Sequence, residues 1–128
     1  MNKIVFSIVE TPTHPKLSHI YLKHGLQEIK FNTTRTAMVN LRKQTPDILV
    51  AEFIYAYSNN YSGIHISNLD VLLISLKKYA PNTKVIIITT KHEQQFLNKL
   101  PTIMPIYKVL IQPVTADQID QTISKIIN

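Results

Sequence analysis

Four polar residues in this 128-residue sequence stand at the ends of apolar runs, where side chains from separate segments can meet. Glu10 follows the first run and Glu52 ends the second, while Thr89 closes a third and Gln112 follows a fourth. Carboxylates are among the hard oxygen ligands that magnesium prefers. If the runs are parallel strands, all four side chains lie at the edge of a sheet where open α/β proteins bind ligands.

Other motifs for metal binding or catalysis are not supported. His14, His19 and His24 recur every five residues, which is about 140° on a helix rather than the facing i, i+4 spacing of a zinc pair. The chain has two glycines, too few for a Rossmann or P-loop phosphate site. It has no cysteine, which excludes disulfides and thiol catalysis and fits a reducing compartment. We therefore expect no metal and no cofactor.

The net charge of +6 raises the question of nucleic-acid binding. The basic residues are scattered, however, and only Arg42–Lys43 and Lys77–Lys78 are adjacent pairs. A solvated face rich in lysine is the favoured interpretation, and nucleic acid is not an expected partner. No apolar run approaches the roughly 20 residues of a membrane span, and the first residues do not resemble a signal peptide. We expect a cytoplasmic protein without a membrane partner.

Predicted strands and helices alternate along the chain, and the ends of the strands position Glu10, Glu52, Thr89 and Gln112. Buried strands are predicted over residues 3–9, 47–53, 85–88 and 106–111, with a more polar edge strand over 28–32. Helices are predicted between them: from Pro12 and Pro15, from Thr33 or Thr34, from Ser67, over 93–100, and from Thr115. This alternation predicts a parallel sheet covered by helices on both faces. We interpret residues 1–128 as one domain.

Helix ends carry signals of their own. Gly25 and Pro101 are expected to end helices, and two capping boxes are predicted, Ser67 with Asp70 and Thr115 with Gln118. The helix from Ser67 places four leucines on one stripe: Leu69, Leu72, Leu73 and Leu76. The polar segment before it contains Tyr55, Tyr57 and Tyr61, which form either a contact surface or part of a solvated loop.

Three segments together resemble the receiver domain of two-component response regulators, over essentially the whole chain. Residues 36–52 give a helix ending in basic residues, then Pro46–Asp47, four apolar residues and an acid. Residues 85–89 give a strand ending in threonine, and residues 111–114 include a strand end followed by Gln-Pro. The resemblance implies a flavodoxin-like (CheY-like) α/β fold. This fold is a three-layer α/β/α sandwich with a five-stranded parallel sheet of strand order 2-1-3-4-5.

The resemblance also implies that the reactive residues have changed. Glu52 stands in place of the aspartate that accepts the phosphoryl group, and Gln112 in place of the lysine that neutralises its charge. Only Thr89 matches the reactive set. The position of the family's switch aromatic on the last strand corresponds to Val109. Tyr107, two residues earlier, either takes this role or simply packs at the strand end.

The metal site is expected to be lost as well. Receivers hold magnesium with two adjacent acids after the first strand, and Ile8 and Val9 correspond to them here, with Glu10 just beyond. Phosphoryl transfer depends on positioning and on neutralised charge. Without the metal and the lysine, a carboxylate at Glu52 has nothing to stabilise the transition state. We therefore expect no magnesium-dependent phosphorylation.

Two interpretations of Glu52 remain. It either imitates the phosphorylated state by placing negative charge near Thr89, or it is a structural carboxylate bound by backbone N–H groups or by Thr89. We favour the structural interpretation, because the imitation needs a cationic partner and Gln112 is not one.

We interpret the chain as a non-enzymatic pseudo-receiver that acts in signal transduction through protein partners. Receivers often pair through the face of the last two helices and the fifth strand, so a homodimer is plausible. Here that face would carry Phe96, Leu97, Lys99, Tyr107, Lys108 and Gln118. The alternative is a small-molecule sensor or weak enzyme whose neutral pocket joins Ile8 and Val9 to Glu52, Thr89 and Gln112. An output domain beyond residue 128 would also fit the resemblance.

Overall fold

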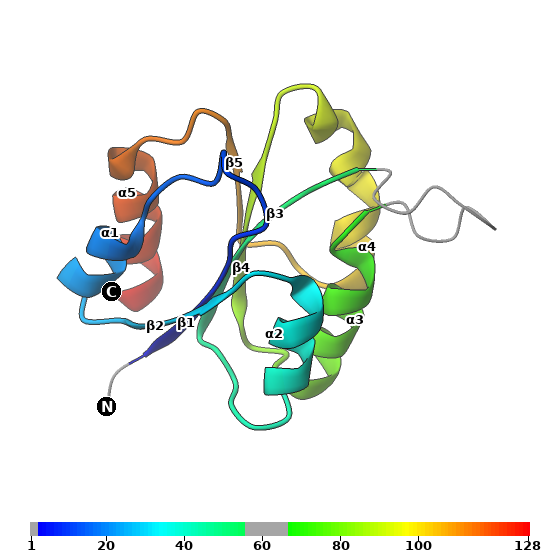
Figure 1. Ribbon diagram of the computed structural model, residues 1–128, viewed down its shortest axis with the longest axis horizontal. Coiled ribbons are helices and arrows are strands. Elements are labelled where there is room, and N and C mark those ends of the chain that lie inside the picture. The colour runs from blue at the N-terminus through cyan, green and yellow to red at the C-terminus, as the bar shows by residue number, and fades with distance from the viewer. Residues whose placement is uncertain (1–2, 56–66) are drawn as a thin grey trace.

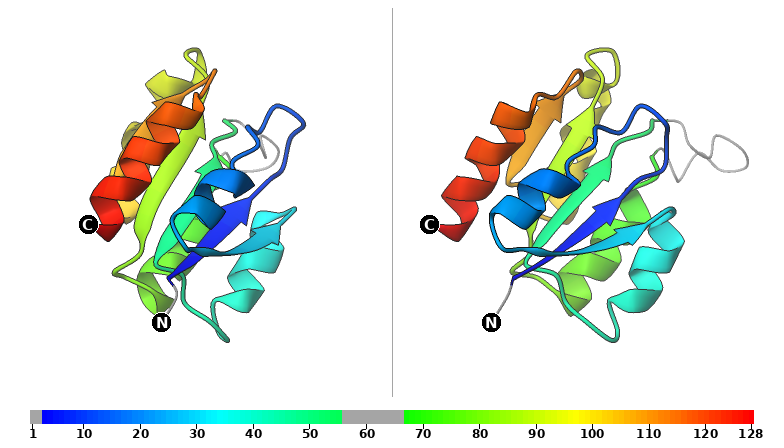
Figure 2. Two further views of the ribbon diagram at one scale, coloured as in Figure 1. Left: turned by 90° about the vertical axis from the view of Figure 1, so that its left-hand side faces the viewer. Right: turned by 60° about the vertical axis from the view of Figure 1, so that its left-hand side comes forward.

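The computed structural model describes residues 3–55 and 67–128. Five strands form one parallel sheet: β1 (Ile4–Ile8), β2 (Gln27–Phe31), β3 (Ile48–Glu52), β4 (Lys84–Thr89) and β5 (Lys108–Ile111). Their order is β2-β1-β3-β4-β5, which confirms the expected topology (Figure 2). Residues 57–63, with Tyr57 and Tyr61, lie outside the described residues, so the suggested tyrosine surface is described only at Tyr55.

Helices cover both faces of the sheet, as a parallel sheet requires. They are α1 (Ser18–Lys23), α2 (Thr34–Asn40), α3 (Asp70–Tyr79), the 3-10 helix η1 (Glu93–Lys99), α4 (Leu100–Ile103) and α5 (Ala116–Ile127). Helices α1 and α5 lie on one face, and α2, α3 and α4 on the other (Figure 1). The predicted three-layer α/β/α arrangement is therefore confirmed.

Side-chain alternation along the central strands builds two cores. Phe6, Leu49 and Ile87 point to the face covered by α2, α3 and α4, where the leucine stripe of α3 is fully buried. Their neighbours Val50 and Ile86 point to the other face, against α1 and α5. The edge strand β2 is less buried, as its more polar sequence predicted. Both faces of β1, β3 and β4 are thus apolar, and polar side chains concentrate at the strand ends.

Three of the predicted helix ends are confirmed. Gly25 follows α1 with φ of 72°, a left-handed conformation that glycine adopts without strain. Thr33 caps α2 by accepting a hydrogen bond from the backbone N–H of Thr36. Thr115 and Gln118 form the complete capping box of α5.

Other boundaries differ from the predictions for local reasons. The first helix begins at Ser18 rather than at Pro12 or Pro15, because residues 11–17 form a loop that is bound to the sheet edge. Strand β5 begins at Lys108 rather than at residue 106. No helix among the described residues is long and apolar enough to cross a membrane.

Two predictions about helix ends were wrong. Ser67 does not form a capping box, because its hydroxyl donates to the Asp70 carboxylate at 2.5 Å and accepts from the N–H of Leu69 at 3.1 Å. Pro101 does not end the fourth helix. It lies in the first turn of α4, where its missing N–H has no intrahelical partner to lose.

Candidate functional site

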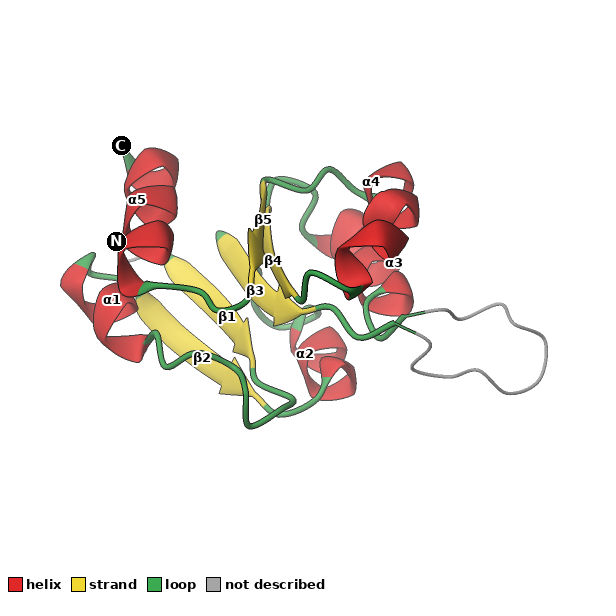
Figure 3. Cartoon of the chain, turned by 90° about the horizontal axis from the view of Figure 1, so that it is seen from above, coloured by secondary structure: helices red, strands yellow, loops and turns green. Residues whose placement is uncertain are grey.

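The carboxyl ends of the strands bring three of the predicted residues to one small cavity. In Figure 1 this end of the sheet is uppermost, and Figure 3 looks down on it. Glu52, Thr89 and Gln112 line a cavity of about 70 Å³ that is also bordered by Thr11, Thr13 and Glu93. The parallel register explains this meeting, because β3, β4 and β5 end side by side.

Glu52 is the buried centre of this edge, with 5% of the residue exposed. Its Oε1 accepts hydrogen bonds from the backbone N–H of Glu10 at 2.9 Å and of Thr11 at 3.1 Å. Its Oε2 accepts a hydrogen bond from the Thr11 hydroxyl. A carboxylate with several backbone donors is held in one orientation. All of its described hydrogen bonds go to the segment after β1.

Gln112, which follows β5, also binds the segment after β1. Its side-chain amide donates to the backbone carbonyl of Thr13 at 3.2 Å. The β1–α1 loop is therefore bound at Thr11 by the end of β3 and at Thr13 by the residue after β5.

Asn68 links Glu10 to the backbone of Glu52. The buried Asn68 amide donates to the Glu10 carboxylate at 2.6 Å and to the Glu52 backbone carbonyl at 2.8 Å. Its own oxygen accepts from the N–H of Ile54 at 2.8 Å. Burial raises the pKa of the Glu10 carboxyl above its usual range, and the nearby charge of Glu52 raises it further, while the hydrogen bond from Asn68 opposes the shift. Sequence reasoning missed Asn68, because an isolated asparagine carries no motif.

No hydrogen bond joins Thr89 to Glu52 among the described residues, although both line the cavity. The Thr89 hydroxyl donates to the carbonyl of Thr90 at 3.4 Å. A second carboxylate, Glu93, also lines the cavity, and it accepts hydrogen bonds from the N–H of Tyr55 at 2.9 Å and the hydroxyl of Thr90 at 3.2 Å. Glu93 is the first residue of a predicted helix, so the sequence pattern does not place its side chain at the strand ends.

Ile8 and Val9 do not line this cavity. Ile8 is fully buried in the core beneath α2, α3 and α4, and Val9 lines a separate cavity of about 430 Å³ next to the loop before α1. The neutral pocket expected from the sequence is therefore wrong, because Ile8 and Val9 are not in the described lining and a second carboxylate, Glu93, joins Glu52 there. In residues 3–55 and 67–128, no three His, Cys, Asp or Glu side chains gather closely enough to hold a metal ion.

The six residues predicted as an interface fall into two groups. Phe96 stacks on Tyr55 with ring centroids 3.8 Å apart, Leu97 packs against the core, and Lys99 pairs with the buried Asp70 at 3.1 Å. These three side chains make contacts within the chain on the α4 side.

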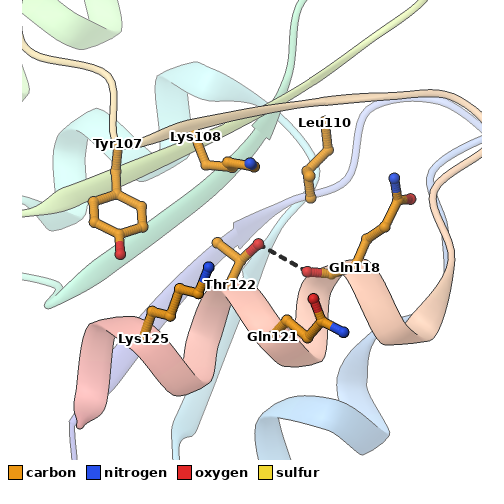
Figure 4. Close-up of a pocket in the computed structure, with 7 residues that line it drawn as sticks. All are labelled: Tyr107, Lys108, Leu110, Gln118, Gln121, Thr122 and Lys125. Atoms are coloured by element: carbon orange, nitrogen blue, oxygen red, sulfur yellow. Dashed lines mark hydrogen bonds between the residues drawn. The ribbon is translucent and has the colours of Figure 1, made fainter.

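Tyr107, Lys108 and Gln118 lie together on the other side, between β5 and α5. They border a groove of about 290 Å³ that Leu110 and Lys125 also line, and the Lys125 side chain reaches from α5 toward Tyr107 (Figure 4). Tyr107 precedes β5, and Lys84 lies 6.0 Å from the centre of its ring. We call this surface the β5–α5 groove.

No protein-family model and no curated protein matches the sequence. Solved structures match the fold over nearly the whole chain. A response regulator from Thermotoga maritima gives a TM-score of 0.75 at 16% identity, covering 99% of this chain and 98% of that chain. The signal receiver domain of an HD domain-containing protein from Pseudomonas fluorescens Pf-5 gives 0.75 at 13% identity, covering 99% and 95%. The BeF3-activated DrrB receiver domain gives 0.72 at 12% identity, covering 99% and 98%. The chain has the CheY-like, flavodoxin-like fold of receiver domains.

Proposed function

We propose that this chain is a receiver-like module that does not accept a phosphoryl group and acts in signal transduction through contact with other proteins. One observation carries the proposal. The carboxylate of Glu52, at the end of β3, accepts three hydrogen bonds from Glu10 and Thr11 of the segment after β1. These donors hold the carboxylate toward the β1–α1 loop and make both oxygens weaker nucleophiles. Attack on a phosphoryl donor would weaken these hydrogen bonds, which are shielded from water.

The charges at this edge also support the proposal. Phosphoryl transfer requires that negative charge on the transferred group be neutralised. The cavity beside Glu52 has a second carboxylate, Glu93, and no lysine, arginine or histidine among the described residues that line it. Gln112 supplies a neutral amide whose described hydrogen bond goes to the loop rather than into the cavity. An anionic phosphoryl donor would meet repulsion here.

The same contacts favour a structural role for Glu52 over an imitation of the phosphorylated state. An imitation would direct the charge toward Thr89, whereas the described bonds of Glu52 hold the loop. We infer that this edge is a fixed part of the scaffold and that the module is not an enzyme. The module would then recognise partner proteins through its outer surfaces. One of these is the β5–α5 groove, which combines an exposed tyrosine with two lysines. A homodimer through this groove is part of the proposal.

A small-molecule sensor or weak enzyme at the strand ends receives less support. The cavity of about 70 Å³ is well below the roughly 300–1,000 Å³ of typical ligand pockets. It has room for little more than bound water.

The proposal is tested by titrating the isotopically labelled chain with beryllofluoride and magnesium, which together imitate a phosphoryl group on a carboxylate. Amide spectra are expected to stay unchanged at residues 10–13 and around Glu52, Thr89 and Gln112. Saturable shifts confined to those residues would overturn the proposal. A receiver domain that beryllofluoride activates serves as the positive control.

A further inference from the structure

Helices α2 and α3 expose apolar side chains that the fold does not use. Val39 on α2 is 55% exposed, and Val71 and Ile74 on α3 are 43% and 58% exposed. Tyr79, at the end of α3, is 36% exposed. These four are among only six exposed large apolar residues in the described part of the chain. Apolar side chains gathered on one surface, rather than scattered singly, mark an interaction site.

The spacing on α3 shows that this exposure follows from the sequence pattern. The leucines at 72, 73 and 76 face the core and are fully buried. Val71 and Ile74 are three residues apart, so they share a second stripe on the outward side of the helix. A surface helix of a single domain normally has polar residues on that side. Helix α3 therefore carries apolar side chains on its exposed face as well as on the face that packs, next to the exposed Lys77 and Lys78.

Helices α2 and α3 lie side by side, so their exposed residues form one surface (Figure 1). The hydroxyl of Ser75 on α3 approaches the sulfur of Met38 on α2 at 3.6 Å. Between the helices is an open groove of about 570 Å³, lined by Met38, Val39, Ile74, Tyr79, Arg42 and Lys78, together with Ser75. We call it the α2–α3 groove.

The charged residues of this groove have one sign. Arg42 and Lys78 are both exposed, and within the described part of the chain no aspartate or glutamate belongs to the groove's lining. Neither cation forms an ion pair with a described carboxylate. The Lys78 amine lies 5.3 Å from the centre of the Tyr79 ring, which keeps this charge beside the apolar floor. The groove therefore has an apolar floor and a cationic rim.

We propose that the α2–α3 groove binds an amphipathic helix of a partner protein that carries acidic residues beside its apolar stripe. A groove between two helices accepts such a helix through side chains at i, i+3, i+4 and i+7. The cationic rim favours a partner helix that has acidic residues on both sides of its apolar stripe. A second copy of this chain fits less well, because each copy would bring Arg42 and Lys78 to the contact without a carboxylate to meet them. The proposal concerns a different face from the β5–α5 groove and holds whether or not Glu52 is reactive.

The test uses designed peptides of roughly 18 residues, about five helical turns, with leucine on one face and glutamate on its flanks. A matched peptide carries lysine in place of every glutamate, and a third has the glutamate peptide's composition in scrambled order. Binding to the full chain is followed by fluorescence anisotropy and by amide chemical shifts. We expect the glutamate peptide to bind about tenfold more tightly than the lysine peptide, because each exposed ion pair adds only a few-fold. The largest shifts are expected at residues 38–42 and 71–79.

Variants of the chain complete the test. Ile74→Asp is expected to abolish binding while the far-ultraviolet circular dichroism stays unchanged. Leu22→Asp, at a 78% exposed leucine on α1, is the matched control and is expected to bind normally. The double variant Arg42→Glu/Lys78→Glu should reverse the preference toward the lysine peptide. Equal binding of all three peptides, or shifts confined to another face, would overturn the proposal. So would a dimer, or binding to phosphatidylglycerol vesicles alone, through the same residues.

Discussion

The carboxylate of Glu52 accepts two hydrogen bonds from one residue, Thr11, through that residue's backbone N–H and its hydroxyl. Thr11 belongs to the loop after β1, and Glu52 ends β3. The carboxylate at the end of β3 thus finds its hydrogen-bond donors within its own chain. This relationship explains how the fold holds a buried acid at the edge of the sheet.

Replacing Glu52 with Gln should destabilise the fold. The amide keeps one acceptor oxygen and turns an NH₂ group toward donors, so at least one buried N–H or hydroxyl loses its partner. We expect the free energy of unfolding to fall by about 2 kcal/mol, which is typical of hydrogen bonds to a charged group. Urea denaturation measures this change. Glu28→Gln, at a partly exposed glutamate on β2, is the control and should change stability by less than about 0.5 kcal/mol. Equal effects of the two substitutions would remove Glu52 from its structural role.

Asn68→Ala should be at least as damaging. The substitution removes the acceptor for the N–H of Ile54 and the donor to the Glu10 carboxylate and the Glu52 carbonyl. Leaving these buried groups unpaired is expected to cost about 2–3 kcal/mol. The matched control is Asn40→Ala, which removes one exposed hydrogen bond to the carbonyl of Thr36. Thermal unfolding distinguishes them, and a stability loss at Asn40 as large as that at Asn68 would contradict the network.

Glu10→Gln should stabilise the protein at neutral pH. Burial raises the pKa of the Glu10 carboxyl in the folded state above its ordinary value of 4.5. The folded protein then binds this proton more tightly than the unfolded chain, so the contribution is complete at low pH and is lost as pH rises through the folded pKa. Glutamine avoids that loss and can still accept from Asn68. We expect a higher Tm for the variant at neutral pH, and a gain that shrinks as pH falls through the folded pKa and is gone below 4.5. A gain independent of pH would argue against this explanation.

Asp120 should behave in the opposite way. A hydrogen bond from Lys23 at 3.0 Å, and a second with His24 at 2.5 Å, hold the pKa of the Asp120 carboxyl below its ordinary value of 3.8. This contribution is present above 3.8 and is lost as pH falls through the folded pKa. Asp120→Asn is therefore expected to lower Tm modestly at neutral pH, with a difference that vanishes in acid. The contact joins α1 to α5 across the outer surface, so the effect should also weaken with added salt.

The sequence predicted the fold well because its dominant signal was the alternation of apolar strands with helices. That signal depends on burial: β3 is buried throughout, and β4 is buried from Val85 onward. Local signals were less dependable. The spacing of Ser67 and Asp70 matched a capping box, yet the buried Asp70 carboxylate accepts from the Ser67 hydroxyl and from the partly exposed Lys99 instead. Pro101 was interpreted as a helix end although a proline is equally acceptable in a first turn.

The candidate site was only partly predictable. Parallel topology placed Glu52, Thr89 and Gln112 at one edge without any knowledge of side-chain contacts. Which groups satisfy Glu52 depended on the path of residues 11–17, and a loop path leaves no periodic pattern in a sequence. The same limit explains why the apolar residues before the loop were assigned to the pocket. The exposed Val71 and Ile74 on α3 are hard to predict, because the buried leucines alone account for the helical pattern.

Intact-mass spectrometry after incubation with acetyl phosphate and magnesium tests the central claim most directly. The full chain and an active receiver domain are treated side by side, and the products are mapped by peptide analysis. The structure predicts that the active receiver gains one phosphoryl group while this chain gains none at Glu52. A stoichiometric phosphoryl adduct on Glu52 would contradict the account.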